Sequence, residues 1–159
     1  MNRILLFECK RPQSLETIDR RVEEGLDQLK RGLNGLQKVR HRGVVALDLT
    51  KAVNPNFEVL VTRAEENIGH SMTQQVDRFV AHYKMAWASP KCSQTIGVLV
   101  RLRQMNIVEY DGYSKLFHGL QVGIAPINST GELNHRLLAS LSDRLAAGRS
   151  AASQVSHLK

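Results

Sequence analysis

The stretch that decides the fold lies near the start of the chain and reads Arg3-Ile-Leu-Leu-Phe-Glu-Cys-Lys10. It is a short apolar run closed by Pro12, which is typical of a buried strand. Ser14 suits the N-cap of a helix, and the apolar residues after it recur three and four positions apart, which predicts one apolar helix face. These apolar residues are Leu15, Ile18, Val22, Leu26, Leu29 and Leu33.

A second apolar run of strand length follows and reads Arg42-Gly-Val-Val-Ala-Leu-Asp-Leu-Thr50. Two strand-like runs joined by a helix of about 20 residues predict a βαβ unit, in which the two strands run parallel. The first third of the chain therefore predicts an α/β fold.

The remaining chain continues the alternation of helices and strands. We expect a helix over residues 64–87, strands over 95–103, 106–113 and 120–124, and a last helix over 133–145. Asp111-Gly112 is a turn signal between two of these strands, whereas residues 53–62 fit neither pattern. We predict one α/β domain over residues 1–147 and a flexible tail rich in Ser and Ala over 148–159.

Composition narrows the class of protein. The 159 residues include only two cysteines, Cys9 and Cys92, without a CxxC motif, which excludes a disulfide scaffold or a zinc ribbon. No apolar run approaches the roughly 20 residues of a membrane span, and the N-terminus lacks a signal-peptide pattern. We therefore expect a cytoplasmic protein that does not contact membranes.

The net charge of +7 favours DNA or another polyanion as a partner. Residues 1–42 carry ten Lys and Arg against six Asp and Glu. The basic residues between Lys30 and Arg42 also fit a solvated helix end, where the helix dipole favours cations. The predicted contacts to the nucleic-acid backbone are Arg11, Lys30, Arg31, Lys38, Arg40 and Arg42.

The residues with the clearest chemical potential are Glu8-Cys9-Lys10. On a strand, residues i and i+2 share one face, so the carboxylate and the ammonium project together from the end of the strand. A carboxylate there can hold Mg²⁺, and a lysine beside it can orient water and neutralise charge on a phosphate. The alternative interpretation is that Glu8 and Lys10 only pair with each other.

In strand–helix–strand context, Glu8-Cys9-Lys10 resembles the (D/E)xK motif of the PD-(D/E)XK, or restriction-endonuclease-like, nuclease superfamily. The resemblance covers about residues 3–50. It implies a three-layer α/β/α core with a mixed sheet, to which the C-terminal strand and helix are additions. It also implies Mg²⁺- or Mn²⁺-dependent hydrolysis of DNA phosphodiesters, with Glu8 and the Cys9 carbonyl as metal contacts and Lys10 as the catalytic lysine.

The second acid of the family, on the preceding strand, has no counterpart among the seven residues before Glu8. The family's first helix and first two strands are also missing, so a metal is expected only if another carboxylate completes the site. Asp48 closes the next strand and either approaches Glu8 or caps a loop.

Three explanations remain open, and with them whether the chain is an enzyme. The chain is a nuclease truncated at its N-terminus, with Met1 inside the fold, or a non-catalytic remnant that binds nucleic acid or protein, or an accidental match. If the first strands are missing, the strand at Arg3–Cys9 is exposed at the sheet edge and favours a homodimer.

Overall fold

The computed structural model describes residues 4–34, 36, 41–63, 66–87, 94–127, 131–149 and 155–158. The chain begins with strand β1 (Ile4–Lys10), a 3-10 turn η1 (Leu15–Thr17) and helix α1 (Ile18–Leu33). Strand β2 (His41–Asp48) runs parallel to β1, so the predicted βαβ unit is confirmed. Ser14 is the N-cap of η1, and its backbone N–H donates to the Thr17 hydroxyl at 3.3 Å.

The second half is built around two long strands. After helix α2 (Thr50–Val53), strand β3 (Leu60–Thr62) and helix α3 (Glu66–Trp87), strands β4 (Thr95–Tyr110) and β5 (Tyr113–Pro126) form a hairpin. Helix α4 (Glu132–Arg149) and strand β6 (Val155–Leu158) follow. The turn at Asp111-Gly112 is confirmed, and Gly112 has a φ of 85°, a conformation that suits glycine. The strand predicted over 95–103 and residues 106–110 of the next predicted strand form one continuous strand, β4, and the strand predicted over 120–124 is part of β5, which begins at Tyr113.

The strands form one six-stranded mixed sheet, which confirms the expected α/β fold with a mixed sheet. Its order is β1-β2-β4-β5-β6, and β3 pairs with the far part of β4. The pairs β1–β2, β2–β4 and β3–β4 are parallel, whereas β4–β5 and β5–β6 are antiparallel. Within the described chain, β1 therefore ends the sheet and has a single neighbour.

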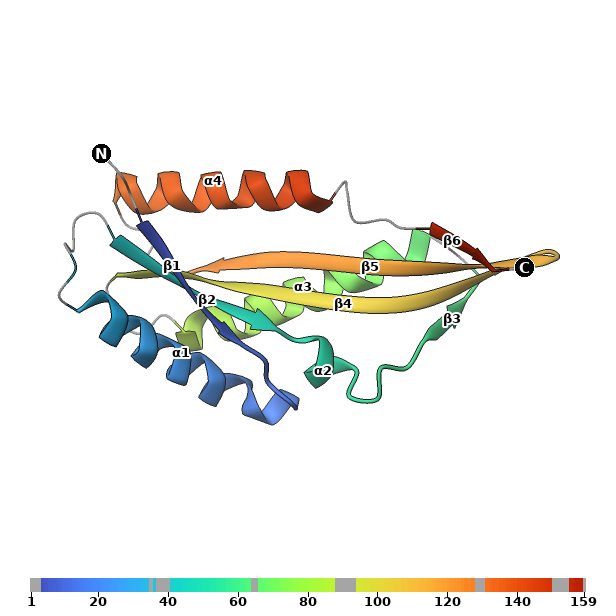
Figure 1. Ribbon diagram of the computed structural model, residues 1–159, viewed down its shortest axis with the longest axis horizontal. Coiled ribbons are helices and arrows are strands. Elements are labelled where there is room, and N and C mark those ends of the chain that lie inside the picture. The colour runs from blue at the N-terminus through green and yellow to red at the C-terminus, as the bar shows by residue number, and fades with distance from the viewer. Residues whose placement is uncertain are drawn as a thin grey trace.

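The main core lies where α1 and α3 pack on one face of the sheet, and α4 packs on the other face (Figure 1). The first core buries α1 and α3 against the middle of β2 and β4, with members including Val22, Leu29, Val45, Val76 and Val100. The smaller core under α4 contains Val44, Ile96 and Leu138. Among the described residues, no helix combines the length and the apolar character that crossing a membrane requires.

Candidate functional site

Glu8 and Lys10 lie on the same face at the carboxyl end of β1, as their spacing predicts. Lys10 Nζ is 3.0 Å from Glu8 Oε1, and it also donates a hydrogen bond to Gln28 Oε1 on α1. The two side chains are mostly buried, with 13% of Lys10 and 31% of Glu8 exposed. The ammonium is therefore held between a strand and a helix rather than free in solvent.

Gly25 explains how α1 lies so close to this pair. A Cβ at Gly25 would lie 3.0 Å from Val45 Cγ1 and 3.7 Å from Glu8 Cγ. The absence of a side chain lets the helix backbone approach the strands and brings Gln28 within reach of Lys10. Because Glu8 is paired with Val45 in the β1–β2 register, both side chains face α1.

Asp48 does not join Glu8, because it faces the other side of the sheet. Val45 and Leu47 point toward the α1 core, so strand alternation directs Asp48 to the opposite face. There Asp48 Oδ2 lies 3.3 Å from Arg11 Nη2 and 3.7 Å from Arg101 Nη2. Of the two interpretations of Asp48, the structure favours the one that makes it a capping residue.

The other oxygen of Asp48 organises the turn into α2. Asp48 Oδ1 accepts hydrogen bonds from the Thr50 backbone N–H at 3.2 Å and from the Thr50 hydroxyl at 2.6 Å. Burial raises the pKa of Asp48, but the Thr50 hydrogen bonds and the charges of Arg101 and Arg11 outweigh burial and hold its pKa below the ordinary value. Asp48 is thus an ionised, fully engaged carboxylate.

A third carboxylate, that of Glu24 on α1, is also paired with cations. Glu24 Oε2 accepts a hydrogen bond from Arg21 at 2.7 Å, and Glu24 Oε1 lies 3.6 Å from Arg20. The hydrogen bond from Arg21 is the main reason that the pKa of Glu24 is lowered, and the charge of Lys10 adds to it. Glu24 therefore interacts electrostatically with the site while its oxygens are bound to arginines.

The described residues place no cluster of metal-ligating side chains around Glu8. They contain no group of three His, Cys, Asp or Glu side chains that could hold a metal. On β1 the one carboxylate is Glu8, whereas hard divalent cations take several oxygen ligands. The Cys9 carbonyl stays a predicted contact, and the Cys9 thiol is exposed. Mg²⁺ commonly takes one or two carboxylates and completes its coordination with waters and substrate phosphates, so Glu8 is the candidate protein ligand on β1.

Four of the six cations predicted to contact nucleic acid lie in the described residues, and Lys38 and Arg40 lie outside them. Arg11 directly follows β1, and its side chain is 66% exposed. Lys30 and Arg31 are exposed in the last turn of α1. These three side chains are accessible to a ligand.

Arg42 is placed differently from the other described cations. It is half-buried, and its guanidinium donates to Asn134 Oδ1 at 2.5 Å and to the His41 carbonyl at 2.9 Å. Gly32, beside Lys30 and Arg31 in sequence, lies against Leu6, nearer the amino end of β1. The four described cations are thus divided between the two ends of the β1–β2 pair rather than gathered in one patch.

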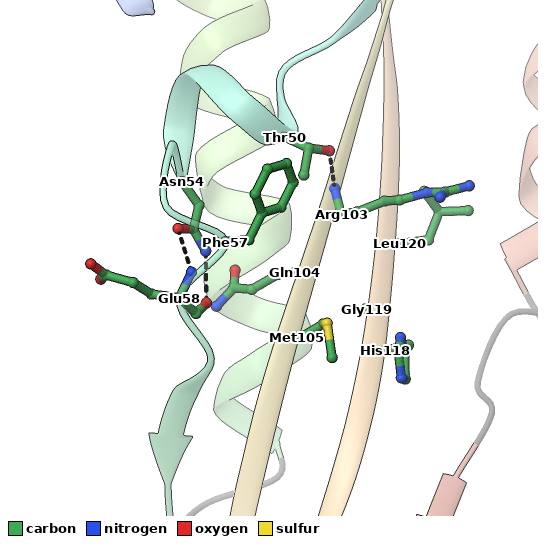
Figure 2. Close-up of a pocket in the computed structure, with 10 residues that line it drawn as sticks. All are labelled: Thr50, Asn54, Phe57, Glu58, Arg103, Gln104, Met105, His118, Gly119 and Leu120. Carbon is green, nitrogen blue, oxygen red and sulfur yellow. Dashed lines mark hydrogen bonds between the residues drawn. The ribbon is translucent and has the colours of Figure 1, made fainter. Parts of the chain in front are cut away.

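Sequence reasoning missed a second group of polar residues on the face opposite Glu8. The backbone N–H of Arg103 donates to the Thr50 hydroxyl at 3.1 Å, so β4 is tied to the turn that Asp48 organises. Beside this link, a cavity of about 380 Å³ lies between Phe57 and the β4–β5 hairpin (Figure 2). The sequence contains one signal that could have pointed to this group. Arg101 and Arg103 are two positions apart, which places two cations on one face of a strand.

Comparisons of the chain with models of protein families, with curated proteins and with solved structures found no match.

Proposed function

We propose that this chain is a nuclease domain of the PD-(D/E)XK type, which hydrolyses DNA phosphodiesters with Glu8 and Lys10 as its catalytic pair and with Mg²⁺ or Mn²⁺. The observation that carries the proposal is the placement of these two side chains together at the carboxyl end of a parallel strand, under a crossover helix. A restriction-endonuclease-like core is part of the proposal, and helices on both faces of a mixed sheet support it.

Lys10 is the residue that would meet the scissile phosphate. Its ammonium is held by Glu8 and by the Gln28 amide, so its direction is fixed before a substrate arrives. A positioned cation stabilises the negative charge that develops on the phosphate in the transition state. Gln28 has no charge, and it therefore positions Lys10 without neutralising it.

Cleavage of plasmid DNA in Mg²⁺ or Mn²⁺ tests the proposal. We expect the wild-type chain to nick the plasmid, and we expect Glu8→Gln and Lys10→Ala each to lower the rate at least about 100-fold, the usual scale for losing one group that stabilises transition-state charge. Glu16→Gln is the matched control, because Glu16 is an exposed acid in η1 outside the site. Cleavage that survives both site substitutions would contradict the roles assigned to Glu8 and Lys10.

A second candidate function is binding of nucleic acid or protein without catalysis. Three observations favour it: Glu8 is paired with Lys10, Asp48 faces away, and Glu24 is bound by arginines. This candidate predicts DNA binding without cleavage in either metal. Absence of cleavage while DNA binding is retained would therefore decide for it and against the nuclease.

The salt dependence of DNA binding identifies the cations that matter. Each phosphate contact contributes about 0.9 to the slope of log K against log salt for duplex DNA. Replacing the exposed pair Lys30 and Arg31 by Gln should therefore flatten the slope by up to about 1.8. Arg136→Gln is the control, because Arg136 is exposed on α4 and paired with Glu132. An unchanged slope would remove the end of α1 from the DNA interface.

A further inference from the structure

The loop before β3 holds an aromatic ring in an unusual position. Phe57 has a φ of 53°, in the left-handed region that bulky residues rarely adopt. The residue is 61% exposed, so burial of the ring offsets little of the strain. Strained residues of this kind cluster at binding and active sites, where the surrounding structure enforces them.

Asn54 enforces the conformation of this loop. The Asn54 side chain accepts the Glu58 N–H at 2.9 Å and donates to the Glu58 carbonyl at 2.7 Å. The Phe57 N–H in turn donates to the Asn54 carbonyl at 3.2 Å. These three hydrogen bonds fix the backbone on both sides of Phe57, so the ring is presented to solvent from a rigid loop.

The ring borders a cavity whose other walls come from β4 and β5. Its volume of about 380 Å³ falls in the range of small-molecule sites, about 300–1,000 Å³. Arg103 and Met105 line it from β4, and His118 lines it from β5 (Figure 2). Within the described residues, the guanidinium of Arg103 has no ion-pair or hydrogen-bond partner, and the residue is exposed.

The charges around the cavity favour an anion. Arg103 lines it, and Arg101 lies two positions before Arg103 on the same face of β4, beside Arg11 and Asp48. The carboxylate of Glu58 points away from the cavity and lies 3.3 Å from the Asn56 amide (Figure 2). The site thus combines an exposed aromatic ring with an unpaired cation.

We propose that this cavity binds one unstacked nucleotide of single-stranded nucleic acid, with the base against the Phe57 ring and a neighbouring phosphate on Arg103. Stacking on an aromatic side chain needs an open base face, which a base inside a duplex does not offer. A guanidinium suits phosphate because it donates from a planar fork. The inference rests on the proposed function in taking nucleic acid as the partner, and it names single strands as the class of nucleic acid that this second site binds.

Binding of a fluorescein-labelled oligo-dT of about 12 nucleotides, measured by anisotropy in EDTA, tests the role of Phe57. We expect the single strand to bind more tightly than a duplex of the same length, and we expect Phe57→Gly to weaken single-strand binding about 5- to 150-fold. Glycine relieves the left-handed strain, so this variant should melt no lower than wild type, and lost binding cannot be attributed to unfolding. Phe57→Trp should retain binding.

Tyr113→Ala is the matched aromatic control. Tyr113 is 48% exposed at the far end of the hairpin, where it stacks on Tyr110 with ring centroids 4.7 Å apart. We expect this variant to bind oligo-dT like wild type. A Phe57→Gly variant that binds like wild type, an equal loss in Tyr113→Ala, or a preference for duplex would each overturn the proposal.

Arg103→Gln tests the phosphate contact. It should flatten the slope of log K against log salt by about 0.7, the contribution of one phosphate in a single strand. An unchanged slope would overturn the assignment of Arg103. Because EDTA prevents metal-dependent cleavage, these measurements stand apart from the nuclease test: binding through Phe57 without cleavage would refute the nuclease alone, and cleavage with no effect of Phe57→Gly would refute the cavity alone.

Discussion

The two carboxylate oxygens of Asp48 serve different parts of the sheet. One oxygen binds the Thr50 backbone and hydroxyl, and the other lies near Arg11 and Arg101. Asp48 therefore joins the end of β2 to β4 and to the residue after β1. A residue with this many partners stabilises the fold, and it is not free to bind a metal.

Asp48→Asn should lower the free energy of unfolding at pH 7 by about 1–2 kcal/mol, because the amide keeps an acceptor for Thr50 and loses both charge interactions. The folded-state pKa of Asp48 is lowered, so its stabilisation is fully present above the unfolded pKa of about 3.9 and is lost as the pH falls through the lower folded value. Urea unfolding from pH 7 to pH 2 should therefore show the two proteins converging below about pH 4.

Glu132→Gln provides the control for this measurement. Glu132 is a 75% exposed acid in the first turn of α4, and among the described residues it pairs across one helical turn with Arg136. Such exposed pairs contribute about 0–1 kcal/mol to stability. The free energy of unfolding of the control should therefore stay close to that of the wild type at every pH. If the Asp48→Asn variant had the same free energy of unfolding as the wild type at every pH, the Asp48 contacts would add nothing to stability.

Residue patterns predicted the pair at Glu8 and Lys10 because alternation along one strand fixes which side chains share a face. The same reasoning could not place Asp48, because β2 is apolar on both faces and its sequence shows no alternation. Phe57 was also beyond prediction, since its orientation depends on hydrogen bonds from Asn54 that no spacing rule reveals.

At the scale of elements, two glycines of β5 lie under α3. Gly119 and Gly123 share one face of the strand, and Cβ atoms built on them would meet Met72 and Val76. Both helix residues are buried, with exposures of 2% and 1%. The close packing of α3 on β5 thus depends on positions without side chains.

Gly123→Ala should destabilise the protein by about 1–3 kcal/mol, the usual cost of overpacking a core. The new Cβ would lie 2.6 Å from Val76 Cγ1, and a β-branched side chain has few rotamers into which it can move. Gly119→Ala should cost less, because the new Cβ meets the flexible end of Met72. Urea unfolding of both variants checks this ranking, and a larger loss in Gly119→Ala would contradict it.

Strand β4 around Gln104 and Asn106 shows why the boundaries of elements were harder to predict than their types. Polar residues at this point favoured two strands, yet the β4–β5 ladder continues without interruption from Gly97 to Tyr110. Asn106 is only 2% exposed and accepts a hydrogen bond from Gln104 at 2.9 Å. A polar residue does not end a strand when backbone pairing and a side-chain partner both persist.

At the scale of the whole molecule, the predicted α/β class and the parallel βαβ unit follow from hydrophobic periodicity, which tertiary packing preserves. The order of the strands does not follow from it, because β4 pairs with β2, β3 and β5 through contacts distant in sequence. The position of β1 at the end of the described sheet leaves its outer backbone groups for another partner.

A homodimer through β1 remains a prediction, and light scattering after size exclusion tests it. A dimer should show twice the mass of one chain, and Phe7→Lys should dissociate it, because charged side chains on edge strands oppose pairing. Phe7 is 47% exposed, so the substitution should leave the fold intact. A wild-type monomer at micromolar concentration would contradict the homodimer.

The position of β2 between β1 and β4 has a consequence for synthesis on the ribosome. The β1–α1–β2 unit is made first, but the far side of β2 is covered only by β4, whose pairing with β2 extends from Thr95 to Arg101. At about 5–20 residues per second, β2 waits roughly 3–10 s for this partner. The β4–β5 hairpin closes across a two-residue turn on a microsecond scale. Because β5 is translated after β4, the hairpin cannot close before β4 is available to β2, and until then the exposed side of β2 is where we expect a nascent-chain chaperone to bind.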